Sequence, residues 1–402
     1  MTKALKLNNI LLLVMTALVG LVLGSVWGGT PTVGTRGLSG GAHAGHRPAH
    51  LLGGDLKAAA VTPGKVRTYY IAADEVLWDY APTGSNQITG KPFTDDENVF
   101  VQNGPTRIGH VYRKALYRQY TDATFQTRVP ADPNLGLLGP VIRAEVGDTI
   151  KVVFKNNASF PASIHPHGVF YQKNSEGAPY ADNTNGAAKA DDAVPPGGTF
   201  TYNWEVPERA GPGPMDGSSV LWMYHSHTDE VADTNAGLVG PMVITRKGSA
   251  KPDGSPIDVD KEVFSYFSVI NENQSPYLDQ NLQEIAQAPH EVAPDDEEGF
   301  EESNLMHSIN GYVYGNGPML TLQKGQRVRW YVFTLGTEVD LHTPHWHGNT
   351  VLSMGMRTDM SHLLPGDMMV TDMTPDDAGT WLFHCHVNDH ILAGMQTRYK
   401  VQ

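Results

Sequence analysis

Four pairs of histidines, each separated by a single residue, stand out in this chain of 402 residues. The pairs are His165 with His167, His225 with His227, His345 with His347, and His384 with His386. Chance placement of the chain's 17 histidines would not produce four such pairs, and neutral imidazole is the commonest metal ligand among side chains. Because alternate residues of a β-strand share a face, each pair would aim two imidazoles at one site.

The chain's only cysteine, Cys385, lies inside the last pair, within "WLFHCHVNDHILAGM" (381–395). If 384–386 is a strand, His384 and His386 face a shared site and Cys385 faces the opposite way. The residues that can approach the cysteine on that side are His342, His390 and Met395. One thiolate, two imidazoles and a weak thioether form a blue-copper electron-transfer site, whereas a closed zinc site more often contains several cysteines.

The paired histidines predict a cluster of several coppers, because eight imidazoles exceed what one metal ion can bind. The backbone joins His384, Cys385 and His386, so electrons collected at the cysteine would have a short covalent route to the cluster. One-electron entry coupled to a multi-copper acceptor is what the four-electron reduction of dioxygen to water requires. We therefore expect these three residues to carry the catalysis.

The chain also repeats its landmarks in one order. "GPVIRAEVGDTIKVVF" (139–154) is similar to "GPMLTLQKGQRVRWYVF" (317–333), and each copy then reaches a His-x-His pair, a Pro-Gly turn and a Trp-x-[Tyr/Phe]-His-x-His motif. The repeat predicts two homologous domains, at 65–250 and 255–402. Short strands separated by turn signals predict an all-β fold of Greek-key sandwiches. The first copy has Ser226 in place of Cys385, so we predict no blue copper there.

The N-terminal region reads as an export signal or an uncleaved anchor over residues 1–30, with Lys3 and Lys6 before an apolar run. Residues 31–64 are rich in Gly, Ala and His and predict a flexible linker. We therefore expect an exported protein that is periplasmic, extracellular or anchored at the outer face of the membrane. The formal charge of −14 argues against a nucleic-acid partner, and a single cysteine cannot form an internal disulfide.

The motifs "HPHG", "HSH", "HTPHWHG" and "HCHVNDHILAGM" stand in the order found in multicopper oxidases. From Tyr69 to Val401 the chain resembles the two-domain kind, and ceruloplasmin-type domains in particular. The resemblance implies two tandem cupredoxin domains, a homotrimer with each cluster between neighbouring subunits, and four coppers per catalytic unit. The implied ligands are His342, Cys385, His390 and Met395 for type 1 copper, His165 and His345 for type 2, and His167, His225, His227, His347, His384 and His386 for the type 3 pair.

A finer likeness concerns the electron donor. "EESNLMHSING" (301–311) is similar to the segment that carries iron-site residues in ceruloplasmin. The implied iron site consists of Glu302, His307, Glu338 and Asp389, the last beside His390. Carboxylate oxygens with one imidazole suit a ferrous ion and favour its ferric product. The resemblance thus implies oxidation of ferrous iron, with Asp389 among the catalytic residues.

Three other functions stay open at this stage. A laccase-like oxidase of phenols or aromatic amines would need an open apolar pocket beside His390 instead of acids. A two-domain copper nitrite reductase would place its blue site in the first domain, which Ser226 opposes. A non-catalytic copper carrier would not need a thiolate joined to two cluster ligands.

Asp182 is one candidate acid for proton delivery, and the methionines of 354–373 could bind cuprous copper or simply pack.

Overall fold

The computed structural model describes residues 64–286, 297–336 and 340–402. The segment expected as a signal or anchor, nearly all of the expected linker, and Glu338 lie outside the described residues. Residues Val61–Gln402 form one compact unit. Within the described ranges, none of the helices is both long enough and apolar enough to cross a membrane.

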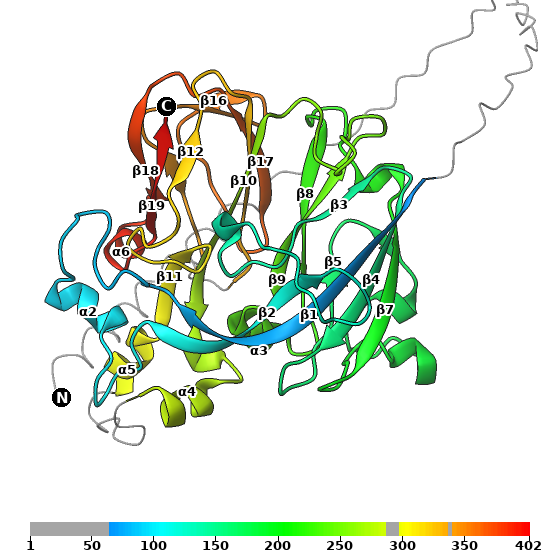
Figure 1. Cartoon of the computed structure of the whole chain (residues 1–402), viewed down its shortest axis with the longest axis horizontal. Helices are drawn as coiled ribbons and strands as arrows, with labels where there is room; N and C mark the ends of the chain where they lie inside the picture. The colour runs from blue at the N-terminus through cyan, green and yellow to red at the C-terminus, as the bar shows by residue number, and fades with distance from the viewer. Residues whose placement is uncertain (1–63, 287–296, 337–339) are drawn as a thin grey trace, which may run out of the picture. The chain divides into compact units, whose positions relative to one another are not determined.

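The N-terminal part of this unit is a sandwich of two sheets, called here the first sandwich (Figure 1). One sheet has the order β2-β1-β4-β7-β6 and the other β3-β9-β8-β5. Their bounds are β1 Val66–Asp79, β2 Val111–Tyr120, β3 Ile142–Glu145, β4 Thr149–Asn156, β5 His165–Pro166, β6 Phe170–Tyr171, β7 Thr199–Glu205, β8 Ser219–His225 and β9 Val239–Thr245.

The C-terminal part is a second sandwich, drawn from yellow-green to red beside the first in Figure 1. Its sheets have the orders β11-β10-β13-β17-β15-β16 and β12-β19-β18-β14. Their bounds are β10 Lys261–Asn271, β11 Leu305–Ile309, β12 Leu320–Leu322, β13 Val328–Phe333, β14 Pro344–Trp346, β15 Val351–Ser353, β16 Met356–Thr358, β17 Met368–Met373, β18 Gly379–Cys385 and β19 Gln396–Val401. The helices are short: α2 Asp95–Val101, α3 Glu230–Ala236, α4 Leu278–Glu284, α5 Glu297–Ser303 and α6 Asn388–Leu392.

The two sandwiches repeat one topology. The parallel pair β1–β4 corresponds to β10–β13, and the parallel pair β3–β9 corresponds to β12–β19. Parallel neighbours at these positions require crossovers between sheets, as in Greek-key sandwiches. The predicted all-β fold of two tandem cupredoxin-type sandwiches is confirmed, and the sequence repeat reflects a repeat in structure.

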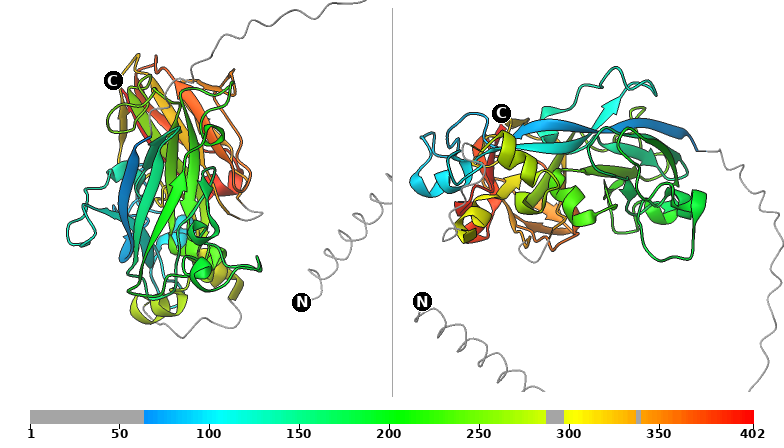
Figure 2. Two further views of the ribbon diagram at one scale, coloured as in Figure 1. Left: turned by 90° about the vertical axis from the view of Figure 1, so that its right-hand side faces the viewer. Right: turned by 90° about the horizontal axis from the view of Figure 1, so that it is seen from below.

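Alternating side chains explain why the sandwiches pack against each other as well as internally. In β8, Trp222 and Tyr224 pack into the first sandwich, while Leu221 and Met223 point into a separate cluster between the sandwiches. In β13, alternate residues likewise divide between the core of the second sandwich and the same cluster. Strands buried on both faces read as continuous apolar runs. The two sandwiches lie side by side, as the view from below in Figure 2 also shows.

A buried ion pair also crosses between the sandwiches. Lys114 of β2 donates to Glu272 Oε1 at 2.5 Å, and both side chains are fully buried. The hydroxyl of Tyr80 donates to the same oxygen at 2.6 Å, and the carbonyl of Asn235 accepts from Lys114 at 2.5 Å. Burial opposes both charges, lowering the pKa of Lys114 and raising the pKa of Glu272, while the opposite charge of each partner offsets that cost.

Removing one member of this pair should therefore cost more than removing both. Lys114→Met leaves Glu272 without its counter-charge in a site that water does not reach, and we expect the free energy of unfolding to fall by about 3–5 kcal/mol. The double variant Lys114→Met, Glu272→Met should recover most of that loss, because neither charge remains. Urea denaturation of both variants measures the difference, and a single variant that loses under about 1 kcal/mol contradicts the expectation.

Candidate metal centres

The end of β18 and the loop after it bring a thiol and two imidazoles together. Cys385 Sγ lies 3.8 Å from His342 Nδ1 and 3.5 Å from His390 Nδ1, and all three side chains are buried. Met395 is buried in the same core, and its carbonyl accepts from the backbone N–H of Cys385 at 3.1 Å. This group, called here the thiol set, presents one sulfur and two Nδ1 atoms to a single point.

Neighbouring polar groups orient the thiol set. Asp340 Oδ1 lies 2.9 Å from His342 Nε2 and accepts from the backbone N–H of Val269 at 2.7 Å. The backbone N–H of Thr343 donates to Cys385 Sγ at 3.4 Å. A carboxylate on the outer nitrogen of a histidine leaves the inner nitrogen free as a metal ligand and fixes the ring. The sulfur and imidazole donors suit a copper ion.

Burial raises the pKa of Cys385, because the thiolate would be a charge removed from water. Backbone N–H groups of Thr343, Val387 and His386 act in the opposite direction. A thiol in such a place stays protonated until a cation arrives, because the thiolate is the form that binds metal. The chemistry of this pocket therefore fits a metal site better than a free nucleophile.

A second group of histidines lies at the same end of β18. His345 Nδ1 is 3.2 Å from His384 Nε2, and His347 Nε2 is 3.0 Å from the same atom. The ring of His386, which is exposed, has its centroid 5.4 Å from that of His345. Strand β14 carries His345 opposite His384 on β18. These four residues are called the second half-site, and Cys385, between two of them in sequence, belongs to the thiol set.

The first sandwich builds a matching group, called the first half-site. Its four members are His165, His167, His225 and His227, with ring centroids 5.1–5.6 Å apart in the pairs that touch. Strand β5 places His165 opposite His225 on β8, as β14 does with β18. Among the described residues, no ring contact joins one half-site to the other. A single chain therefore presents two groups of four imidazoles.

Backbone carbonyls select the tautomer of three of these histidines. The Nδ1 atoms of His165, His225 and His384 lie 2.7, 2.9 and 2.6 Å from the carbonyls of Glu176, Ser226 and Cys385. A carbonyl only accepts, so each Nδ1 carries the proton and each Nε2 keeps its lone pair. The Nε2 atoms are thus prepared to bind metal.

Burial also keeps these imidazoles neutral. It lowers the pKa of His167 and of His384 to about 4 and that of His225 to about 3, because an imidazolium would lose its hydration. Neighbouring imidazoles add to the effect in each case. Neutral imidazole is the form that binds metal, so these three rings are ready for metal at neutral pH.

The residues expected at an iron site are only partly brought together. The ring of His307 lies 5.2 Å from that of His390 in the thiol set, and burial lowers the pKa of His307 to about 4. Its Nδ1 lies 2.9 Å from the carbonyl of Leu305, which leaves Nε2 with the lone pair. Glu302 on α5 and Asp389 on α6 are exposed, and Glu338 lies outside the described residues.

Other candidate residues have structural partners. Asp182 pairs with Lys173 at 2.8 Å and Lys189 at 3.0 Å, and hydrogen bonds from Lys173 hold the pKa of Asp182 far below its ordinary value. Such a carboxylate is a poor proton donor at neutral pH.

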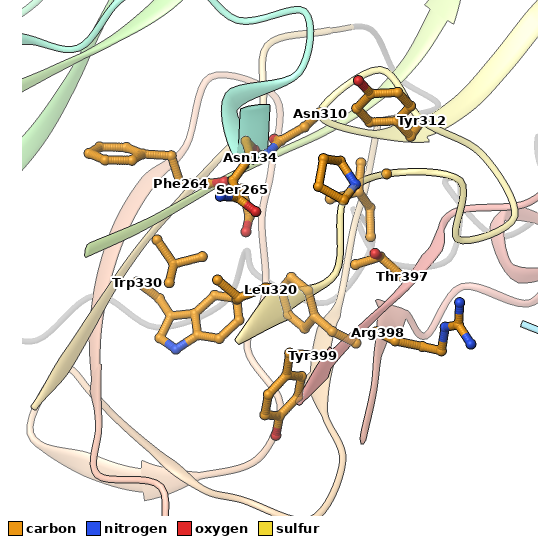
Figure 3. Close-up of a pocket in the computed structure, with 15 residues that line it drawn as sticks. Asn134, Phe264, Ser265, Asn310, Tyr312, Leu320, Trp330, Thr397, Arg398 and Tyr399 are labelled. Atoms are coloured by element: carbon orange, nitrogen blue, oxygen red, sulfur yellow. Dashed lines mark hydrogen bonds between the residues drawn. The ribbon is translucent and has the colours of Figure 1, made fainter. Parts of the chain in front are cut away.

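His362 lines a cavity of about 810 Å³ with Met354, Met368 and Met369. A smaller cavity of about 50 Å³, beside Phe383, has no His, Cys or Met among its lining residues (Figure 3).

The sequence pattern missed Asp340, which stands two residues before His342. In the sequence, Asp340 looks the same as an exposed acid near a strand end. Only the folded structure shows that its carboxylate is buried against the imidazole of His342. The pattern also missed Asp233, a buried acid of α3.

The tandem Greek-key sandwiches, with one thiol set and paired imidazole half-sites, define a metal-binding class of β protein. Residues 119–249 and 281–402 each match a family model described as multicopper oxidase. The chain belongs to the multicopper oxidase family, and copper is the metal that this membership implies.

Several relatives share more than 40% of their aligned residues with the chain. It is 45% identical over 338 residues to Ferroxidase HEPHL1 of Homo sapiens, 42% over 363 residues to Hephaestin of Rattus norvegicus, and 44% over 349 residues to Ceruloplasmin of Homo sapiens. These alignments cover 83%, 89% and 84% of this chain but 29%, 31% and 32% of the relatives. The chain therefore spans roughly a third of the length of each.

Solved structures show the same fold at lower identity. Multicopper Oxidase mgLAC is 20% identical with a TM-score of 0.54, and the likeness covers 84% of this chain and 86% of that one. Blue Copper Oxidase from Nitrosomonas europaea is 17% identical with a TM-score of 0.53 and the same coverage.

Proposed function

We propose that the chain is a ferroxidase that couples the one-electron oxidation of ferrous iron to the four-electron reduction of dioxygen to water. The observation that carries this proposal is an unbroken series of contacts. The His307 ring touches the His390 ring, His390 Nδ1 lies 3.5 Å from Cys385 Sγ, and one peptide bond joins Cys385 to His384 of the second half-site. Such a series would connect a donor site near the surface to a dioxygen site.

The thiol set and the half-sites would hold four coppers per catalytic unit. Type 1 copper would bind His342, Cys385, His390 and Met395. Type 2 copper would bind His165 and His345, and the type 3 pair would bind His167, His225, His227, His347, His384 and His386. Copper at these places supplies one-electron chemistry in the thiol set and multi-electron chemistry in the cluster. The chain itself contributes neutral rings, fixed tautomers and the Asp340 carboxylate behind His342.

The half-sites also support a homotrimer. Each half-site offers four imidazoles, and in the described residues of one chain no ring contact joins them. A head-to-tail interface that repeats around a ring would place the first half-site of one subunit against the second half-site of its neighbour. Dioxygen would then react between subunits, and type 2 copper would take one histidine from each.

Ferrous iron is the donor best supported by the surface beside His390. Glu302, His307, Glu338 and Asp389 would form the iron site, because carboxylates and one imidazole suit a ferrous ion and stabilise the ferric product. Relatives named ferroxidase, hephaestin and ceruloplasmin support the same donor. An exported protein, whether periplasmic, extracellular or anchored at the outer face of a membrane, would meet iron and dioxygen together.

Removing two of the acids should separate iron from other donors. We expect Glu302→Ala with Asp389→Ala to lower kcat/KM for ferrous iron by about tenfold or more, because the lost carboxylates bind the ion and its product. Oxidation of a bulky phenol should stay within about twofold, since its electron would enter the thiol set without contact with those acids. Steady-state kinetics with recorded oxygen uptake measure both.

Glu298→Ala is the matched control, because it removes another exposed carboxylate from α5. Equal losses for iron and phenol in the double variant would remove the iron assignment and favour a laccase-like oxidase. A copper nitrite reductase would instead reduce nitrite without consuming dioxygen. A non-catalytic carrier would turn over neither donor.

A further inference from the structure

The first sandwich contains a position-by-position counterpart of the thiol set. The backbone N–H of Ser226 donates to the carbonyl of Leu238 at 3.1 Å, as that of Cys385 donates to Met395 at 3.1 Å. The backbone N–H of Ser163 donates to Ser226 Oγ at 3.0 Å, as that of Thr343 donates to Cys385 Sγ at 3.4 Å. Ser226 therefore occupies the place of the cysteine in three dimensions.

The other two positions correspond in the same way. The backbone N–H of Leu238 donates to the backbone carbonyl of Asp233 at 3.1 Å, and that of Met395 donates to the backbone carbonyl of His390 at 2.8 Å. Asp233 therefore takes the place of His390. Ala162 and Val194 exchange backbone hydrogen bonds as His342 and Leu363 do. The four positions of the thiol set are thus filled in the first sandwich by Ala162, Ser226, Asp233 and Leu238.

A hydrogen bond stands where the second sandwich would place its metal. The hydroxyl of Ser226 donates to Asp233 Oδ2 at 2.5 Å, and the backbone N–H of Asp229 donates to the same oxygen at 3.0 Å. Ser226 is fully buried and Asp233 is 1% exposed. Burial raises the pKa of Asp233 to about 6, and the hydrogen bond from Ser226 opposes this rise.

The bond lies directly behind two members of the first half-site. Ser226 stands between His225 and His227, and the backbone N–H of His227 donates to Ser163 Oγ at 3.0 Å. Ser163 in turn donates its own N–H to Ser226. The carboxylate on α3, the hydroxyl just after β8 and the loop at Ser163 therefore form one buried network. It holds the backbone N–H of His227 through Ser163, and the carbonyl of Ser226 accepts from Nδ1 of His225.

We propose that Asp233 is a positioning residue that orients His225 and His227 for copper by hydrogen bonding to Ser226, in place of the metal that links the corresponding residues of the second sandwich. The inference rests on the proposed function and concerns the same copper cluster. A cross-link made by protein groups exists before any metal binds. The first half-site is therefore preorganised in the metal-free chain, which reduces the ordering that copper binding requires.

The test compares copper-loaded Asp233→Leu, Asp233→Asn and Ser226→Ala with Thr234→Ala, whose hydroxyl in the unaltered chain bonds only within α3. Three quantities are measured: blue absorption per chain, copper per chain and oxygen uptake. Blue absorption reports the Cys385 site and shows that the second sandwich is intact. Copper per chain reports the cluster independently of turnover.

We expect Asp233→Leu and Ser226→Ala to keep the blue absorption of the control, to bind less copper per chain, and to lose about tenfold in oxygen uptake. Asp233→Asn keeps an acceptor oxygen and should stay within about threefold of the control. The double variant Asp233→Leu, Ser226→Ala should be no worse than the worse single one, because both remove the same bond.

Full copper and unchanged uptake in Ser226→Ala or in Asp233→Leu would overturn the proposal. So would losses that add in the double variant, since they would show two independent roles. If Asp233→Leu fails to fold, Ser226→Ala and Asp233→Asn still decide. The proposed function is read separately from the unaltered chain: if that chain is colourless after copper loading and takes up no oxygen, the function fails, whatever the variants do.

Discussion

Cys385→Ser is expected to abolish the blue colour of the copper-loaded protein and to lower its oxygen uptake by about a hundredfold or more. The thiol would supply the sulfur ligand of the thiol set, and it is the atom through which electrons would enter the backbone path to His384 and His386. A hydroxyl is a much weaker ligand for copper and leaves two imidazoles without their sulfur. Visible absorption and oxygen-electrode traces on the same preparation measure both effects.

The first sandwich indicates that this variant should fold. Ser226 already occupies the equivalent place there. Its backbone N–H donates to the carbonyl of Leu238, as that of Cys385 donates to the carbonyl of Met395. Loss of colour would therefore report a lost ligand, and urea denaturation of the metal-free variant checks that its stability stays close to that of the unaltered chain. A variant that remains equally blue and consumes oxygen at an unchanged rate contradicts the assignment of Cys385.

Local sequence pattern predicts the all-β fold class, and the resemblance of four motifs to multicopper oxidases predicts the family. A spacing of two residues puts both members of a His-x-His pair on one face of a strand, and this rule needs no tertiary information. The structure places His384 with His345 and His347, and Cys385 with His342 and His390, as that rule requires. The repeated order of landmarks predicted two sandwiches because each landmark marks a strand or a turn.

Residues that act through distant partners escaped the pattern. Asp340 contacts Val269, 71 positions away, and Lys114 pairs with Glu272, 158 positions away. Asp233 looked like one of several acids after the "HSH" motif. Its role depends on its burial and on the path of the chain through α3. The segment from Ser226 to the turn at Gly237 is two residues longer than the corresponding segment from Cys385 to Gly394. Long-range burial decides these cases, and a local pattern contains no measure of it.

Two inactive variants are expected to restore activity to each other. His165→Ala damages only the first half-site and His345→Ala damages only the second, so if the chain forms the proposed homotrimer, each variant alone should lose oxygen uptake. In a mixed trimer, an interface formed by the intact first half-site of one chain and the intact second half-site of another is complete. Random association makes about one quarter of the interfaces complete, so we expect co-expressed chains to recover about one quarter of the normal uptake.

The decisive control mixes two variants that are damaged in the same half-site. His165→Ala with His225→Ala offers no interface with an intact first half-site, because both substitutions fall in the group presented by the first sandwich. That mixture should stay inactive, while His165→Ala with His345→Ala recovers. If both mixtures remain inactive although the chains associate, the eight histidines do not meet between subunits. If recovery appears in both, the two half-sites are not the units that the interface combines.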